Sequence, residues 1–140
     1  MARITGLAVP YFSSSVDQGG FVEVIEPNAI KLEGAEIRAL YEHKPDELLG
    51  RTQSKTLRLN NSADGVGFEL DIPNTTLGND LIELIKRGDL SGCSFQMFVE
   101  SDSWNYDSSP AVRIIHRARI DEITITAQPA YQATTVEVIV

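Results

Sequence analysis

The sequence predicts a β-rich fold (all-β or α+β), a barrel-like arrangement of about seven strands with helices packed outside. Short segments in which apolar and polar residues alternate recur along the chain, separated by Gly, Pro, Asn, Asp and Ser. One segment has a clear helical period, and alternating strand–helix–strand units are missing, which disfavours a doubly wound parallel sheet. At 140 residues, with 42% hydrophobic and 23% charged residues, the chain is expected to form a single domain over residues 1–140.

The N-terminal part predicts strands at Ile4–Tyr11 and Phe21–Ile25, joined by a polar loop. Pro27 suits the first turn of a short helix to about Leu32, because its ring presets φ and its missing N–H has no helical partner there. The alternation over Glu36–His43 predicts a strand that carries His43 at its end. Pro45 is expected to end this strand.

The middle of the chain predicts a hairpin followed by the main helix. The strands Lys55–Asn60 and Val66–Ile72 flank an Asp64-Gly65 pair, which supplies the positive φ of a hairpin turn. In the helix, apolar residues recur at i, i+4, i+7 and i+8 from Leu77. Asn74, Thr75 or Thr76 can cap its start, and Gly88 ends it.

The C-terminal part predicts more strands and one polar loop. The strands are expected at Ser91–Val99, Val112–His116, Arg119–Thr126 and Val136–Val140, with a loop at Ser101–Pro110. In the first of these strands, Cys93, Phe95 and Met97 share one face, so Ser94 lies on the opposite face. Glu122 is likewise expected on the face of Ile120 and Thr124, away from Ile123 and Ile125.

Ser94, His43 and Glu122 are therefore candidates for a nucleophilic site. A Ser, a His and an acid on neighbouring strands are the parts of a serine hydrolase, in which the imidazole takes the hydroxyl proton and the carboxylate orients the imidazole. Simpler interpretations remain open: Ser94 as a tolerated small residue, His43 as a surface histidine, and Glu122 with Asp121 as a solvated edge pair.

Other candidate residues have weaker arguments. His116 is the competing base, although the alternation around it places it on an Arg-rich strand surface. Cys93 could be a thiol nucleophile, but its register points it into the core, where a free Cys acts as a small hydrophobe. Trp104 and Tyr106, in the expected polar loop, either contact a peptide substrate or anchor the loop.

Charge and composition exclude several classes of function. The net charge of −8, from 20 acidic and 12 basic residues, repels phosphate backbones and argues against nucleic-acid binding. No membrane-spanning run and no signal peptide are recognised, so a cytosolic protein that is not secreted is expected. The single cysteine excludes an internal disulfide, and no phosphate-loop, dinucleotide or zinc motif is present, so neither a cofactor nor a metal is expected.

Six segments in order carry a resemblance to a known family. They are Gly6–Ala8, Glu26–Ile30, Ala39–His43, Leu49–Thr52, Gly88–Phe95 and Asp121–Tyr131. Together they resemble the HK97-type prohead maturation proteases of tailed bacteriophages, over nearly the whole chain. That family is related in fold to the herpesvirus assemblins, so the resemblance implies a small closed or nearly closed β-barrel with helices around it.

The resemblance also implies roles and partners. Ser94 would be the nucleophile, His43 the general base and Glu122 the residue that orients His43. The protein would be a serine endopeptidase that cuts scaffolding and major capsid protein segments, and itself, inside the procapsid in the host cytoplasm. A homodimer or higher homo-oligomer, and a trimmed or self-processed C-terminus, are compatible with this family.

The sequence departs from related patterns at the expected oxyanion site. Herpesvirus relatives use a late arginine pair, but no Arg or Lys follows Arg119 here. The oxyanion would be met by backbone N–H groups near Gly92 and Ser94, or by Arg51, Arg113, Arg117 or Arg119. Two alternatives to an enzyme stay open: a noncatalytic β-barrel module for capsid assembly or scaffold binding, and a β-rich ligand-binding domain.

Overall fold

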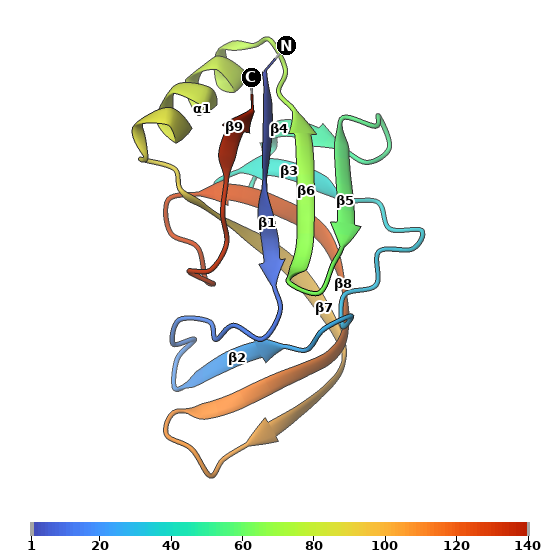
Figure 1. Cartoon of the computed structure of the whole chain (residues 1–140), viewed down its shortest axis with the longest axis vertical. Coiled ribbons are helices and arrows are strands. Elements are labelled where there is room, and N and C mark those ends of the chain that lie inside the picture. Colours follow the sequence, from blue (N-terminus) through green and yellow to red (C-terminus); the bar gives the residue numbers. More distant parts are fainter. Residues whose placement is uncertain (1, 140) are drawn as a thin grey trace.

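Two β-sheets pack on one hydrophobic core, with a helix at the end of the molecule where both termini lie (Figure 1). The computed structural model describes residues 2–139. The elements are β1 (Arg3–Pro10), β2 (Phe21–Ile25), β3 (Arg38–Tyr41), β4 (Lys44–Arg51), β5 (Leu57–Asn61), β6 (Gly65–Asp71), α1 (Thr76–Arg87), β7 (Gly92–Asn105), β8 (Ala111–Thr126) and β9 (Glu137–Ile139). The first sheet has the order β5-β6-β1-β9. The second has the order β2-β8-β3-β4, with β7 also paired to β8.

The second sheet is organised around the 16-residue strand β8. One edge of β8 pairs with β7 in an antiparallel ladder along almost its full length. The other edge takes β2 beside its first residues and β3 beside its last, both in parallel. The strands predicted at Val112–His116 and Arg119–Thr126 are thus one strand, and β7 continues through the first half of the predicted loop at Ser101–Pro110. Figure 1 shows β7 and β8 extending as a long hairpin beyond the first sheet.

The predicted closed or nearly closed barrel is wrong. Within residues 2–139, β5 pairs only with β6 and β9 only with β1, so the first sheet ends at two open edges. A barrel needs one hydrogen-bonded ladder that returns to its first strand. Alternation in the sequence assigns faces to a strand but not its neighbours, and this is why it could not exclude closure.

The core consists of side chains from both sheets. Ile4 and Leu70 from the first sheet and Ile115, Ile123 and Ile125 from β8 are fully buried. The segment after β8 packs closely on β1 and β7 because two glycines leave room for it. A Cβ on Gly6 would lie 1.9 Å from the carbonyl oxygen of Thr135, and one on Gly92 would lie 2.7 Å from Pro129 Cγ.

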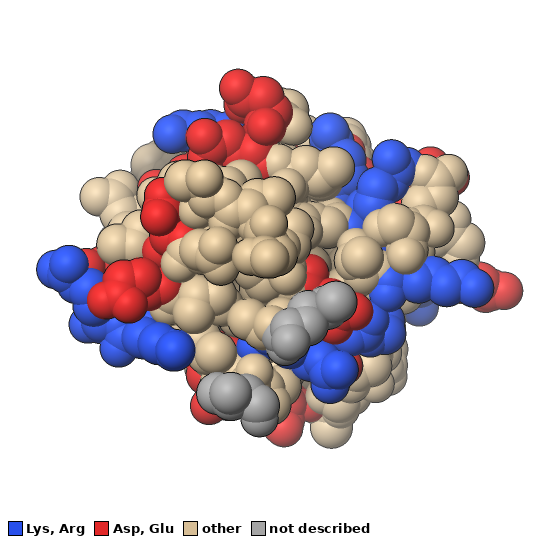
Figure 2. All heavy atoms as spheres, turned by 90° about the horizontal axis from the view of Figure 1, so that it is seen from above, with Lys and Arg blue, Asp and Glu red and all other residues tan. Residues whose placement is uncertain are grey.

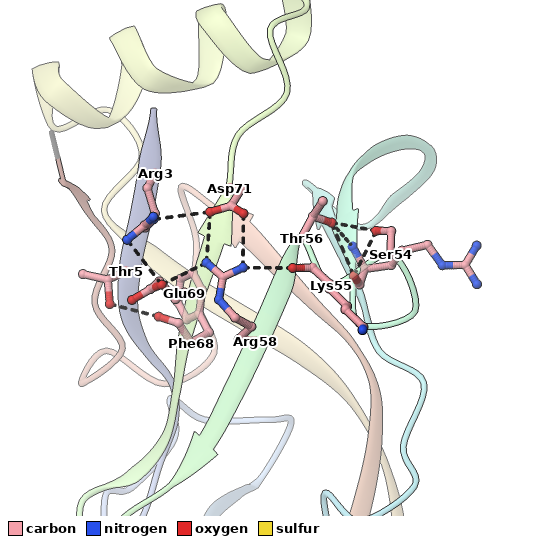
Figure 3. A network of polar contacts seen from close by, with 10 residues as sticks. Arg3, Thr5, Ser54, Lys55, Thr56, Arg58, Phe68, Glu69 and Asp71 are labelled. Atoms are coloured by element: carbon pink, nitrogen blue, oxygen red, sulfur yellow. Dashed lines mark hydrogen bonds and ion pairs between the residues drawn. The ribbon is translucent and has the colours of Figure 1, made fainter. Parts of the chain in front are cut away.

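The outward face of the first sheet carries an ion-pair network across three strands. Arg58 of β5 donates to Glu69 at 2.9 Å and to Asp71 at 2.9 and 3.1 Å, and Arg3 of β1 reaches the same two acids (Figure 3). The Arg58 guanidinium holds the pKa of Asp71 below its usual range. At the end of the molecule that carries α1, Figure 2 shows groups of both signs interspersed with uncharged surface.

Helix α1 begins and ends as the sequence predicts. The Thr75 hydroxyl accepts from the Gly78 N–H at 3.0 Å, and Gly88 adopts a left-handed conformation with φ 86° that ends the helix. The apolar stripe buries Leu81 and Ile85. Of the three predicted capping residues, Thr75 is the cap.

The predicted short helix from Pro27 to Leu32 is a turn instead. The Ala29 N–H donates to the Glu26 carbonyl at 3.1 Å, and Asn28 has φ 63°. Pro at the second position of a four-residue turn and Asn with positive φ at the third are the residues of a type II turn. After this turn the Lys31 N–H donates to the Ala118 carbonyl of β8, so the segment follows the sheet.

The predicted strand Glu36–His43 is correct in its centre but not at its end. β3 stops at Tyr41, and Glu42 and His43 form a two-residue turn in which both have positive φ, 49° and 59°. The chain then returns as β4, so Pro45, which was expected to end the strand Glu36–His43, lies within the next strand. Leu40 pairs with Leu48 and Tyr41 with Lys44, so residues 45–47 bulge out of the ladder, where Pro45 needs no partner.

The cap of α1 allows a direct test of the helix boundary. We expect Thr75→Ala to lower the free energy of unfolding by about 1 kcal/mol, because the Gly78 N–H loses its acceptor. Thr76→Ala, at the first helical position, is the matched control and should change it by less than about half as much. The free energies are measured by urea unfolding, and an equal decrease in the two variants would argue that Thr75 is not the cap.

Candidate active site

Ser94 lies on β7 directly opposite Thr124 of β8. Its neighbour Cys93 is completely buried in the core, so Ser94 lies on the other face of the sheet, as predicted. The side chain is nonetheless enclosed, with 7% of Ser94 exposed. Its Oγ accepts a hydrogen bond of 3.1 Å from the backbone N–H of Ala130, in the segment that follows β8.

Glu122 lies on β8 opposite Gln96, on the same face as Ser94 and Thr124. Only 5% of Glu122 is exposed. The register passes from the pair Gln96–Glu122 to the pair Met97–Ile120, which leaves Asp121 as an extra residue in β8. Because of this bulge Ile120 is buried in the core, and the prediction that Ile120 shares the face of Glu122 is wrong.

His43 is the second residue of the turn between β3 and β4. Its Nδ1 contacts the carboxylate oxygen Oε2 of Glu122, and its backbone N–H donates to Thr124 Oγ1 at 2.8 Å. When a carboxylate accepts from the Nδ1 proton of a neutral imidazole, Nε2 is left free to accept a proton. The His43 side chain is half exposed, so a substrate can approach it.

The structure thus brings two of the three predicted residues into contact and places the third on an adjacent strand of the same face. Within residues 2–139 no hydrogen bond joins Ser94 to His43, and Ser94 Oγ is bonded to Ala130 instead. Thr124 lies between the three: it is opposite Ser94, two residues after Glu122, and bonded to the backbone of His43.

Sequence reasoning missed Glu42 and Thr124. The Glu42 Oε1 accepts from the Ala127 N–H at 3.1 Å, which ties the His43 turn to the segment that covers Ser94. Thr124 is completely buried and donates its hydroxyl proton to the Leu40 carbonyl at 3.1 Å. The signal for Thr124 was available, because the alternation already placed it on the face of Glu122.

The segment that covers Ser94 is anchored by Tyr131. The buried Tyr131 hydroxyl donates to Glu23 at 2.6 Å, and its ring packs on Phe95 with a centroid separation of 5.5 Å. Burial, reinforced by the Glu23 carboxylate, raises the pKa of Tyr131 far above its ordinary value, so the hydroxyl keeps its proton. On the other side, Thr134 Oγ1 accepts from the Cys93 N–H at 3.0 Å.

His116, the competing base, lies in a second Ser–His–Glu cluster. Its Nε2 is 2.8 Å from Ser103 Oγ, and its Nδ1 is 2.9 Å from Glu26 Oε2. This cluster sits on the extended part of the β7–β8 hairpin. Ser103 is exposed, as are 36% of the His116 side chain and 44% of the Glu26 side chain. The imidazole of His116 contacts both the hydroxyl and the carboxylate, but this cluster is exposed to solvent, whereas Ser94 is buried.

The arginines considered for an oxyanion site have other contacts. Arg113 bonds to Asp102 and Glu23, and both Arg117 and Arg119 pair with Glu100. Arg51 lines a cavity of about 120 Å³ together with Arg38 and Asp121. Within residues 2–139, the donor that reaches Ser94 Oγ is a backbone N–H, that of Ala130.

Trp104 and Tyr106 lie far from this site. They stack with a centroid separation of 5.8 Å, and Trp104 meets the edge of Phe21 of β2 at 5.0 Å. Trp104 is ten residues beyond Ser94 on β7, roughly 30 Å along an extended strand. These contacts join the hairpin to β2, in agreement with the anchoring alternative.

A comparison with protein families identifies the chain. The family model described as Caudovirus prohead serine protease matches residues 1–140. The chain belongs to the caudovirus prohead serine protease family. Membership makes it a serine protease of phage capsid maturation. No curated protein and no solved structure matches, so the expected likeness to the herpesvirus assemblins stays a prediction.

Two further findings concern other kinds of site in this prohead protease. No group of three or more His, Cys, Asp or Glu that could hold a metal ion occurs among residues 2–139. Among the described residues, no helix is long and apolar enough to cross a membrane.

Alkylation tests whether Cys93 is a buried core residue or a reactive, catalytic thiol. Burial raises the pKa of the Cys93 thiol, so we expect no alkylation by iodoacetamide at pH 8 in the folded protein and full alkylation in guanidinium chloride, measured by mass spectrometry. Ser101→Cys in a Cys93→Ala background, with an exposed thiol, should react under native conditions. Rapid alkylation of native Cys93 would contradict its place in the core.

Proposed function

We propose that the chain is a serine endopeptidase that cleaves scaffolding and capsid protein segments, and itself, with Ser94 as nucleophile, His43 as general base and Glu122 as its orienting carboxylate. The observation that carries the proposal is the contact of His43 Nδ1 with the buried Glu122 carboxylate, on the sheet face that also holds Ser94. Family membership supports the reaction class, and the procapsid interior in the host cytoplasm is the proposed place of action.

The proposed reaction follows from the roles of these groups. His43 Nε2 takes the Ser94 hydroxyl proton as Oγ attacks the peptide carbonyl, and Glu122 stabilises the imidazolium that forms. The imidazolium then protonates the leaving amine, the peptide C–N bond breaks, and an acyl-enzyme remains on Oγ. Water, activated by the same imidazole, releases the acid and restores Ser94.

This mechanism requires Ser94 Oγ to exchange partners when substrate binds. In the structure Oγ is held by the Ala130 N–H, while the His43 ring is half exposed on its turn. Catalytic hydrogen bonds commonly tighten only in the complex with substrate. A carbonyl carbon that approaches Oγ would bring its oxygen close to backbone N–H groups of this region, which supports assigning the oxyanion to backbone donors such as Ala130 instead of an arginine.

The exposed cluster of Ser103, His116 and Glu26 is the competing site for the same reaction. Its three groups are hydrogen-bonded in the order of a triad. Water competes for exposed groups of this kind, and electrostatic stabilisation of a transition state is strongest where water is excluded. Enclosure of Ser94 and Glu122 therefore favours the first site.

Substitution of both clusters tests the assignment. We expect Ser94→Ala and His43→Ala to reduce cleavage of co-expressed scaffold or capsid protein by at least about 1,000-fold, because each removes a group that acts as part of a unit. Glu122→Gln should reduce the rate less than either of these, since it leaves nucleophile and base in place. The readout is the initial rate of product appearance by mass spectrometry.

Matched controls come from the exposed cluster. Ser103→Ala and His116→Ala should leave the rate within about twofold of the parent, and a fluorophosphonate probe should label Ser94 alone. Undiminished cleavage by Ser94→Ala would overturn the proposal, and loss of activity in Ser103→Ala would move the site to the hairpin. Binding of scaffold without cleavage in assembling procapsids would favour the noncatalytic module.

A further inference from the structure

We propose that Thr124 is a positioning residue that holds the turn carrying His43 in its active arrangement. The inference rests on the proposed function, because it concerns the base of that same site. Thr124 does not touch Glu122 or the imidazole through any hydrogen bond among residues 2–139. Its hydroxyl bonds to the backbone of Leu40, in β3 before the turn, and of His43, the second residue of the turn.

Both hydrogen-bonding roles of the Thr124 hydroxyl are fixed. Oγ1 accepts from the His43 N–H at 2.8 Å and donates its proton to the Leu40 carbonyl at 3.1 Å. Thr124 and Leu40 are completely buried. Because a buried polar group without a partner is unfavourable, the hydroxyl specifies where the His43 backbone must lie relative to β8.

The turn needs such support because of its residues. Glu42 and His43 both have positive φ, a conformation that favours Gly and Asn and is unfavourable for most other residues. Such a backbone persists only where its surroundings determine it. Glu42 is held by the Ile125 carbonyl and by its own bond to Ala127, whereas the backbone of His43 is held by Thr124.

The position of Thr124 relates the base to the other two groups. Thr124 is opposite Ser94 in the β7–β8 ladder, and directly opposed Cβ atoms lie about 4.5–5.5 Å apart. Glu122 is two residues earlier on the same strand and face, about 7 Å away. The hydroxyl of Thr124 therefore sets the distance of His43 from both its carboxylate and the nucleophile.

Variants of Thr124 test whether its hydroxyl positions the His43 turn or whether the side chain only fills space. Thr124→Val keeps the shape of the side chain but leaves the His43 N–H and the Leu40 carbonyl without a partner. We expect kcat to fall about 10- to 100-fold, with KM within about twofold, because misplacement of a catalytic group by about 1 Å can cost this much. Thr124→Ser restores the hydroxyl, so its kcat should lie within about threefold of the parent.

Thr126→Val is the matched control. Thr126 is on the same strand and face, is buried to a similar degree, and its Oγ1 accepts from the Gln128 N–H at 3.1 Å; within residues 2–139 its side chain has no hydrogen bond to the His43 turn. It should lower the unfolding midpoint by an amount comparable with Thr124→Val while kcat stays within about threefold of the parent. Rates are measured on a purified peptide from the capsid protein's cleavage site, with fluorophosphonate labelling of Ser94 as a second readout.

The outcomes distinguish the two proposals. If Ser94→Ala keeps full activity, the proposed function fails. If Ser94→Ala is inactive while Thr124→Val matches Thr126→Val in kcat, or Thr124→Ser is as slow as Thr124→Val, the positioning role of the Thr124 hydroxyl is overturned. If Thr124→Val does not fold, Thr124→Ala replaces it, and the same loss of kcat with rescue by Ser is expected.

Discussion

The candidate site depends on one strand, β8, that is hydrogen-bonded on both edges. Its antiparallel ladder with β7 places Ser94 opposite Thr124, and its parallel ladder with β3 brings the His43 turn beside Glu122 and Thr124. A shift of either ladder by one residue would turn Glu122 and Thr124 toward the core. The isoleucines of β8 resist such a shift, since Ile123 and Ile125 would then leave the core in exchange.

A layer of buried polar side chains on the outer face of this sheet is the second feature of the site. Ser94, Glu122 and Thr124 are each less than 10% exposed, yet none belongs to the apolar core. Each has a hydrogen-bond partner: Ala130 for Ser94, His43 for Glu122, and Leu40 and His43 for Thr124. The segment after β8 thus encloses the site without leaving these groups unpaired.

Local rules predicted much of the fold. Alternation assigned Cys93 to the core and Ser94 to the other face, and the cap, stripe and terminal glycine of α1 were all readable from sequence. The resemblance also selected His43 and Glu122, which the structure brings into contact. These features depend on neighbouring residues or on a pattern within one segment.

What sequence could not predict depends on distant partners. The bulge at Asp121 is determined by the ladder with β7 and reverses the face of Ile120. The positive φ of Glu42 and His43 contradicts their intrinsic preference and persists because Thr124, Ile125 and Ala127 hold the turn. Pro45 was expected to end the strand Glu36–His43, but β3 ends before it, and Pro45 lies in a bulge of β4 where its missing N–H has no cost. Closure of a barrel depends on pairings that no single segment specifies.

The parallel pairing of β2 and β3 with β8 has a consequence during synthesis. β8 begins 86 residues after the end of β2 and 70 residues after the end of β3, so the second sheet can form only when its central strand has left the ribosome. His43 and Ser94 are made first and have no common scaffold until Glu122 and Thr124 arrive. The proposed triad would therefore stay incomplete in a nascent chain until β8 has been translated, which would confine the proposed self-cleavage to the completed molecule.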